Sequence, residues 1–477
     1  MKKKYILATA LALTLGAGAV HDLNSIDRAV AQIVQTVTPS TGVSQTNQTL
    51  SLSEADTSYL LAALLRGDFE IEALIEANWT DAYIPPAIEI YNFIPNPDVR
   101  RTVLRKLQES TGQNIGPDMS EWYSWLWNQP ELKIAGYDNF KSEFYKRIDP
   151  KFGKYFKDRA HTSEIRLDEI RWGGVRQDGI PPLRQPKMIS AKKANYLDDD
   201  NVVFGIEVNG DVRAYPKRIL AWHEMFVDRV GGVDVAGVYC TLCGTVILYD
   251  TDAKGLSHDI GTSGFLYRSN KLMYDRATQS LWNTLKGEPV LGPLVGKDIK
   301  FDHRSVVTTT WGKWRELHPD TKVLSLDTGH RRNYDEGVAY HEYFATDDLM
   351  FHTPFSDHRL KNKEEVLALR FKGGGNDPVA ISTNFLEKNP IYSGVSGKQK
   401  FVVLTDETGA NRVYDPAGVT FKSLNGDNTI TDSQGARWQV AESRLTHPDG
   451  RELKRLPYHR AFWFGWHASY PNTRLIK

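Results

Sequence analysis

The segment TWGKWRELHPDTKVL, residues Thr310–Leu324, has a partial second copy in FWFGWHASYPNTRLI, residues Phe462–Ile476. The two copies share two tryptophans, a proline and a threonine when they are aligned without a gap. Self-similarity within a chain indicates a repeated structural unit, so these segments predict two lobes of one fold. The matched residues are Trp311 with Trp463, Trp314 with Trp466, Pro319 with Pro471 and Thr321 with Thr473.

A second pair of segments repeats in the same order along the chain. VYCTLCGTVILYD (Val238–Asp250) aligns without a gap to VLTDETGANRVYD (Val403–Asp415), and a valine, a glycine, a tyrosine and an aspartate coincide. Short alternating strands surround these segments, as in NVVFGIEVNGDVRAYP (Asn201–Pro216), where Asn-Gly predicts a hairpin. The repeat therefore predicts two β-rich lobes, at about residues 198–327 and 364–477.

The N-terminal part of the chain has helical periodicity. SEADTSYLLAALLRGDFEIEALIEA has apolar residues at helical spacing, with Ser53 as the expected N-cap. Another helix is expected between Pro97 and Gly112. Such short helix pairs are similar to HEAT repeats. We expect an α-helical region over residues 54–164, followed over residues 165–477 by a mostly β, duplicated, two-lobe domain, so that the protein is α+β overall.

The two lobes differ at residues that could carry chemistry. Residues that only support the fold should recur in both lobes, but the only two cysteines of the chain, Cys240 and Cys243, do not recur. A histidine and a methionine, His223 and Met273, are also confined to the first lobe. We interpret these four side chains as a functional site. Their counterparts in the second lobe are Thr405, Thr408, Asn389 and Ile430, the last two allowing a shift of one residue.

The residue types of this site favour a metal. The cysteines lie between two apolar strands, which indicates a tight turn, whereas thioredoxin-type pairs open a helix. Gly244 can supply the positive φ that the turn needs. A closed structural zinc site needs four ligands, so we expect Cys240 and Cys243 to be joined by His223 and, as a soft fourth ligand, Met273. Two thiolates with imidazole and thioether favour copper, with zinc next, for metal handling or electron transfer.

Other interpretations of these residues stay open. His223 also fits a hydrogen-bonded core histidine, and Met273 fits ordinary core packing. The cysteines also fit a thiol–disulfide redox pair without metal, or a structural disulfide in a binding scaffold that catalyses nothing. The sequence leaves open whether the protein is an enzyme.

The N-terminus is typical of a secretory signal peptide. Met1–Lys4 is basic, and the apolar stretch Tyr5–Val20 is shorter than the about 20 residues that a spanning helix needs. Cleavage sites are expected after Ala19 or Ala31, so residues 1–31 hold the signal peptide and the start of a leader. Residues 32–53 read as the flexible leader. We expect a periplasmic or secreted protein with no stable membrane span, in an oxidising compartment.

The net charge of the chain limits the classes of partner that it is expected to bind. Lys plus Arg and Asp plus Glu both number 59, so the formal net charge is zero. Nucleic-acid binding relies on basic residues that neutralise phosphates, and the chain has no basic excess. We therefore expect no nucleic acid, and we expect another periplasmic protein to bind through the helical region.

Five stretches in a fixed order carry a family resemblance: DEIRWGGVRQDGIPPL (Asp168–Leu183), RAYP with HE (within Arg213–Glu224), YCTLCGT (Tyr239–Thr245), LMYDRATQSLW (Leu272–Trp282) and AFWFGW (Ala461–Trp466). From Asp168 to its end the sequence resembles a bacterial and archaeal family known only as a domain of unknown function. Typical members are exported and have Tyr-Cys-Pro-Leu-Cys-Gly, where this chain has Thr241 in place of proline. The resemblance implies no established activity.

Overall fold

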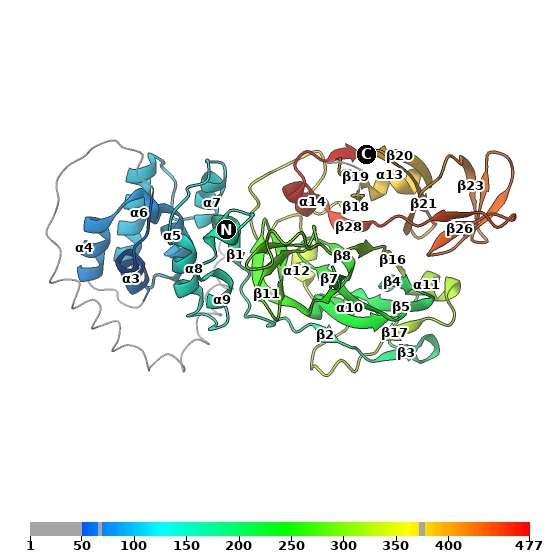
Figure 1. The fold of residues 1–477 in the computed structure, drawn as a ribbon, viewed down its shortest axis with the longest axis horizontal. Helices are drawn as coiled ribbons and strands as arrows, with labels where there is room; N and C mark the ends of the chain where they lie inside the picture. The colour runs from blue at the N-terminus through cyan, green and yellow to red at the C-terminus, as the bar shows by residue number, and fades with distance from the viewer. Residues whose placement is uncertain (1–49, 65–68, 372–376) are drawn as a thin grey trace. The chain divides into compact units, whose positions relative to one another are not determined.

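The computed structural model describes residues 50–64, 69–371 and 377–477 (Figure 1). These residues form two compact units, which we describe separately. One unit holds the residues up to Trp122 together with Leu132–Phe144, and the other holds Tyr123–Glu131 together with Tyr145–Lys477. The predicted signal peptide and nearly all of the predicted leader lie outside the described residues. Among the residues described, no helix is both long and apolar enough to cross a membrane.

The N-terminal part of the described chain is helical, as predicted. The first helix begins after Ser53, whose hydroxyl accepts a hydrogen bond from the backbone N–H of Asp56. The helix that starts at Pro97 ends at Gly112, which has φ +68°. HEAT-like pairing of these helices stays a prediction. The helices are α3 (Glu54–Ala62), α4 (Phe69–Asn78), α5 (Ile84–Ile90), α6 (Pro97–Thr111), α7 (Met119–Trp127), α8 (Tyr137–Tyr145) and α9 (Gly153–Phe156).

The first lobe of the β-rich unit is built on a five-stranded sheet in the order β16 (Val307–Thr310), β4 (Val202–Val208), β5 (Asp211–Pro216), β17 (Lys322–Leu324) and β3 (Met188–Ser190). β4 and β5 form the hairpin predicted at Asn209-Gly210, and these two residues have φ of 50° and 82°. Positive φ at both central residues is the reason that Asn-Gly favours such a hairpin. β16 runs antiparallel to β4, whereas β17 runs parallel to β5.

The second lobe repeats this arrangement in the order β28 (His459–Phe462), β18 (Glu365–Leu369), β19 (Val379–Ser382) and β29 (Arg474–Ile476). β28 is antiparallel to β18, β18 is antiparallel to β19, and β29 is parallel to β19. These relations match those of β16, β4, β5 and β17 one by one. The repeat seen in the sequence is therefore a repeat of strand order and strand direction.

The matched tryptophans occupy the same place in each lobe. They lie on the helices α11 (Trp311–Leu317) and α14 (Trp463–Ser469), which follow β16 and β28, and all four indoles are fully buried. The indole N–H of Trp314 donates to the hydroxyl of Thr321 at 3.0 Å, and that of Trp466 donates to Thr473 at 2.9 Å. The shared threonines recur because each satisfies a buried indole.

Each lobe adds a three-stranded meander. The strands are β6 (Met225–Val230), β7 (Val233–Cys240) and β8 (Thr245–Asp250) in the first lobe, and β20 (Ile391–Ser396), β21 (Gln399–Thr405) and β22 (Asn411–Tyr414) in the second. β2 (Leu183–Arg184) and β15 (His303–Arg304) flank the first meander. The shared tyrosines are buried, and each hydroxyl donates to a backbone carbonyl, Tyr249 to Thr284 at 2.6 Å and Tyr414 to Ala441 at 2.7 Å.

A further antiparallel sheet follows each meander. In the first lobe its strands are β1 (Ile170–Trp172), β11 (Ile260–Tyr267), β12 (Asn270–Asp275), β13 (Leu281–Asn283) and β14 (Glu288–Leu291). In the second lobe they are β23 (Phe421–Asn425), β24 (Thr429–Asp432), β25 (Arg437–Val440), β26 (Arg444–Thr446) and β27 (Glu452–Lys454). Met273 pairs with Trp282 across one sheet, and Ile430 pairs with Trp438 across the other. The two sheets thus place equivalent residues opposite a tryptophan.

The two lobes contact each other through their tryptophan helices. The backbone N–H of Phe462, just before α14, donates to the carbonyl of Cys243 in the turn between β7 and β8 at 2.7 Å. In the reciprocal contact, Lys313 on α11 forms an ion pair of 2.7 Å with Glu407 in the turn between β21 and β22. Each lobe therefore closes the turn of the other with the start of its own helix.

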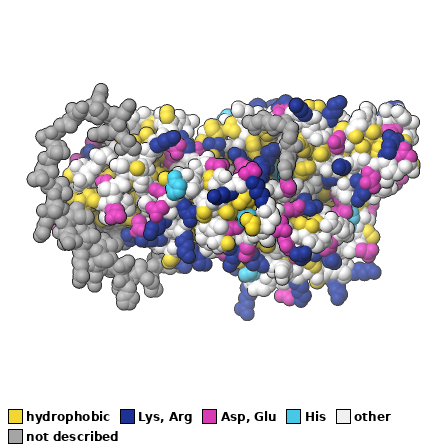
Figure 2. Space-filling model, viewed as in Figure 1, with side chains coloured by type: hydrophobic (Ala, Val, Ile, Leu, Met, Phe, Trp, Pro, Cys, Tyr) yellow, Lys and Arg dark blue, Asp and Glu magenta, His cyan; other side chains and the backbone are white. Residues whose placement is uncertain are grey.

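Charges of both signs are mixed on the surface. Figure 2 shows Lys and Arg side chains beside Asp and Glu side chains on the face in view. Exposed pairs such as Arg444 with Glu452, at 2.8 Å, contribute about 0–1 kcal/mol each. The buried tryptophan contacts are therefore the better test of what holds the lobes.

We expect Thr321→Val and Thr473→Val each to lower the free energy of unfolding by about 1–3 kcal/mol, because each leaves a buried indole N–H without its acceptor. Urea titration followed by circular dichroism measures both. Thr420→Val, on an exposed residue, is the matched control and should change stability little. A large loss in one lobe with none in the other would contradict the equivalence of the two contacts.

Candidate functional site

Cys240 and Cys243 lie in the turn that joins β7 to β8. Cys240 ends β7 and pairs with Thr245 at the start of β8. The backbone N–H of Cys243 donates to the carbonyl of Cys240 at 3.2 Å, and Gly244 has φ +57°. A Cβ atom at Gly244 would lie 2.7 Å from the ring of Phe462, so both the conformation and the packing require glycine. The positive φ predicted for Gly244 is confirmed.

Hydrogen-bond donors converge on one of the two sulfurs. Both thiols are free and buried, with Cys240 2% exposed and Cys243 0% exposed. The thiol of Cys243 faces two acceptors, the Cys240 sulfur and the carbonyl oxygen of Ser269 at 3.2 Å. The backbone N–H of Lys271 also donates to the Cys240 sulfur. Cys240 is therefore the sulfur that this site can hold as a thiolate.

A buried ion pair lies near the sulfurs. The ammonium group of Lys271 contacts the carboxylate of Glu224, and their side chains are 7% and 6% exposed. The hydroxyls of Thr241 and Tyr340 donate to Oε1 of Glu224 at 2.6 Å and 3.0 Å. Burial of two charges is costly unless they are paired and hydrogen-bonded, and here both conditions hold. Such an ion pair beside two thiols marks a candidate site.

The surroundings move the two thiol pKa values in opposite directions. Burial raises the pKa of Cys240, but the hydrogen bond from Cys243 and the donors of Lys271 outweigh burial and hold that pKa below its usual value. Burial, and then the hydrogen bond to Cys240, raise the pKa of Cys243 well above its usual value. The pair thus combines one thiol that ionises readily with one that keeps its proton.

A segment between the two lobes covers the turn. Its helix α12 (His341–Phe344) places Tyr343 over Leu242, and the Tyr343 hydroxyl donates to the Leu242 carbonyl at 2.7 Å. The ammonium group of Lys363 lies 3.4 Å from the centre of the Tyr343 ring. Apolar side chains, including Leu266, complete the cover around both sulfurs. Exclusion of water strengthens the electrostatic interactions inside.

His223 is hydrogen-bonded on both ring nitrogens. Nδ1 lies 2.9 Å from the carbonyl oxygen of Pro181, and Nε2 lies 2.6 Å from the hydroxyl of Tyr334. Burial lowers the pKa of His223 to about 4, so its ring is neutral at pH 7. These partners correspond to the hydrogen-bonded core histidine that the sequence left as an alternative.

Met273 packs in a core cluster with Trp282 and Ile260, whereas the cysteines belong to a different cluster. Across residues 50–64, 69–371 and 377–477, no group of three or more His, Cys, Asp and Glu side chains lies close enough to hold a metal ion. The structure brings Cys240 and Cys243 together, with His223 and Met273 engaged by other partners. The predicted copper or zinc site stays a prediction, with its two sulfur ligands adjacent.

The charged residues of the site, Glu224 and Lys271, give a weak signal in the sequence. Glu224 directly follows His223, but its φ of +55° ends α10 (Lys217–His223), and its carboxylate contacts Thr241 while His223 contacts Pro181. Nothing in the local sequence shows which of two adjacent side chains faces the turn. The comparison of the lobes could have found both residues, because Pro390 and Asn428 stand at their places in the second lobe.

The fold and the site define a two-lobed β protein with a buried dithiol turn. The chain belongs to the family described as protein of unknown function (DUF3179), whose model matches residues 177–473. That range holds the cysteine turn and all of both lobes except β1 and β29, which lie just outside its ends. No curated protein and no solved structure matches the chain.

In the reduced protein we expect iodoacetamide to alkylate Cys240 at lower pH than Cys243, because only the thiolate reacts. Cys243→Ala removes a donor to Cys240, so the pH profile of Cys240 alkylation should move to higher pH. Mass spectrometry at a series of pH values measures both rates. Thr408→Ala, at the place of Cys243 in the second lobe, should leave the profile unchanged.

The two members of the buried ion pair, Lys271 and Glu224, should shift the pH profile of Cys240 alkylation in opposite directions. Lys271→Met removes a positive charge and should move Cys240 alkylation to higher pH, whereas Glu224→Gln removes a negative charge and should move it to lower pH. Shifts of the same sign in both variants would contradict the electrostatic account of the site.

Proposed function

We propose that Cys240 and Cys243 form a thiol–disulfide redox couple. The observation that carries the proposal is that both free, buried thiols lie on one tight turn, in which the backbone N–H of Cys243 donates to the carbonyl of Cys240 at 3.2 Å. Such a turn brings the Cα atoms of its first and fourth residues within about 7 Å, so the two cysteines need little backbone movement to close a disulfide. The opposite pKa shifts give each cysteine its own part, Cys240 as the attacking thiolate and Cys243 as the thiol that resolves the intermediate.

The reaction transfers two electrons. The Cys240 thiolate attacks one sulfur of a substrate disulfide, forms a mixed disulfide and releases the other sulfur as a thiolate. Cys243 then loses its proton and attacks the Cys240 sulfur, which expels the second substrate thiolate. The two leaving thiolates take up the proton of Cys243 and one from solvent. The protein ends with a Cys240–Cys243 disulfide, and the substrate is reduced to two thiols.

Glu224 and Lys271 support this chemistry through their charges. Lys271 stabilises the Cys240 thiolate through both its ammonium group and its backbone N–H. Glu224 holds the ammonium group in place and is itself fixed by Thr241 and Tyr340. Both residues are buried, so their interactions with the sulfurs are weakly screened.

Access to the sulfurs requires movement of their cover. Tyr343 and Leu242 lie against the sulfurs, and both cysteines are buried in the closed arrangement. Attack on a disulfide needs an exposed thiolate. The proposal therefore includes displacement of α12 from the turn before a substrate disulfide can reach Cys240.

We expect purified wild-type protein, equilibrated in graded mixtures of reduced and oxidised dithiothreitol or glutathione, to interconvert between dithiol and internal disulfide with one two-electron midpoint. Alkylation and mass spectrometry count the free thiols. Cys243→Ser should instead accumulate a mixed disulfide with glutathione at Cys240, because no resolving thiol remains. Cys240→Ser should form its mixed disulfide far more slowly.

The matched control comes from the second lobe. Cys240→Thr with Cys243→Thr installs the residues of the twin turn and should keep native circular dichroism, with stability changed by about 1–2 kcal/mol. The proposal fails if the wild-type thiols stay reduced across the whole range. Uptake of one copper or zinc ion that protects both thiols, with no disulfide formed, would instead favour the metal hypothesis.

A further inference from the structure

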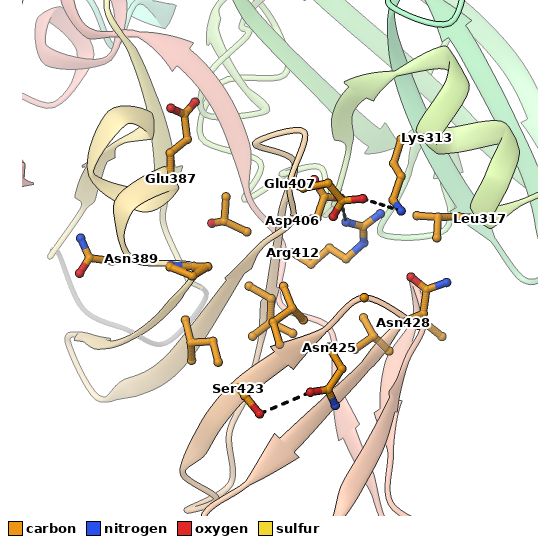
Figure 3. Close-up of a pocket in the computed structure, with 18 of the residues that line it drawn as sticks. Lys313, Leu317, Glu387, Asn389, Asp406, Glu407, Arg412, Ser423, Asn425 and Asn428 are labelled. Carbon is orange, nitrogen blue, oxygen red and sulfur yellow. Dashed lines mark hydrogen bonds and ion pairs between the residues drawn. The ribbon is translucent and has the colours of Figure 1, made fainter.

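An open cleft of 810 Å³ lies on the second lobe and is bordered by Lys313, Leu317 and His318 of the first lobe. Figure 3 shows its residues: Arg412 with Asp406, Glu407 and Lys313 on one side, and Ser423 with Asn425 on the strand opposite. The edge strand β23 contributes four consecutive residues, Lys422–Asn425, so the backbone of the strand itself lines the cleft.

The cleft is the counterpart of the cysteine site. In the alignment of the lobes, Thr405, Asp406 and Glu407 stand at the places of Cys240, Thr241 and Leu242. The helix α13 (Thr383–Lys388) ends beside the cleft at Asn389, as α10 ends at His223 beside Glu224. The repeated fold thus produces a recess at the same turn in each lobe, and only the recess of the second lobe is open.

In the first lobe, polypeptide fills this recess. The Tyr343 hydroxyl on α12 bonds the carbonyl of Leu242, and the Tyr340 hydroxyl bonds the carboxylate of Glu224. The corresponding residues of the second lobe, Glu407 and Pro390, both line the open cleft. In the first lobe, polypeptide thus covers the place that is open in the second.

The lining of the cleft has mixed polarity, because aliphatic side chains such as Ile391, Leu404 and Leu424 lie beside its charged and amide groups, and this mixture favours a peptide. Among the described residues that line the cleft there is no Phe, Tyr or Trp, the side chains on which nucleobases stack. Its buried charges are balanced within the protein, since Arg412 pairs with Asp406 at 2.9 Å and with Glu442 at 2.7 Å. The free edge of β23 offers backbone N–H and C=O groups to an extended chain. The turn residues Thr405–Glu407 stand where the first lobe has Cys240–Leu242, the turn on which Tyr343 of α12 packs.

We propose that this cleft binds an extended peptide segment of a partner protein, which adds to β23 as β1 adds to β11 in the first lobe. The segment pairs with the edge of β23 and meets hydrogen-bonding side chains from α13 and from the turn after β21. This site is separate from the cysteines, so it stands whatever their chemistry.

The test starts from a library of random dodecapeptides displayed on phage and selected on the full-length wild-type protein. We expect an enriched peptide family. Its synthetic members should bind in fluorescence anisotropy and should slow hydrogen exchange at residues 404–407 and 422–425. Asn389→Trp with Ser423→Trp fills the cleft and should weaken this binding at least tenfold. Ser433→Trp with Asn472→Trp, two exposed positions outside the cleft, is the matched control and should bind like the wild type.

Three results would overturn the proposal. If the selection enriches no peptide family, the proposal that the cleft binds a peptide is wrong. Peptides that bind the filled variant as well as the wild type, or that protect other residues from exchange, place their site elsewhere. If the wild-type protein self-associates and the filled variant is a monomer, the cleft binds a second copy of the chain. Hydrogen exchange on the wild type decides the site even if the filled variant does not fold.

Discussion

The arrangement of the β-rich unit depends on one reciprocal contact, in which the start of each tryptophan helix closes the turn of the opposite lobe. Phe462 bonds the backbone of Cys243 on one side, and Lys313 pairs with Glu407 on the other. Each turn is thus held from its own lobe by a β-ladder and from the other lobe by a helix. Each turn therefore has contacts to both lobes, which ties the two halves of the repeat into a single unit.

This shared frame allows the two turns to differ in chemistry. α14 approaches the cysteine turn so closely that a Cβ atom at Gly465 would lie 3.1 Å from that of Cys243. Lys313 stands at the place of Gly465 in the first copy and extends to Glu407 instead. A glycine therefore admits a dry, tightly packed pair of sulfurs, whereas a lysine supports a polar recess.

Much of this arrangement could be predicted from the sequence, because buried residues that serve both lobes recur with fixed spacing. The matched tryptophans and threonines predicted the repeat, and Gly244 predicted a turn of positive φ. Side-chain direction could not be predicted in the same way. The left-handed backbone of Glu224 sends its carboxylate toward Thr241, and His223 bonds Pro181 and Tyr334. Such a reversal depends on one dihedral angle, which leaves no periodic pattern in the sequence.

Burial and charge act on the Cys240 thiol in opposite directions, and their balance sets its pKa. A buried thiolate is costly, and the nearby Glu224 adds to that cost. The hydrogen bond from Cys243 and the two donors of Lys271 more than offset both effects, since the pKa of Cys240 lies below its usual value. A stabilised Cys240 thiolate exists only in the reduced form, so under the proposed function it favours the dithiol over the disulfide. Under the proposed function, such a pair is a stronger oxidant than one with unperturbed thiols.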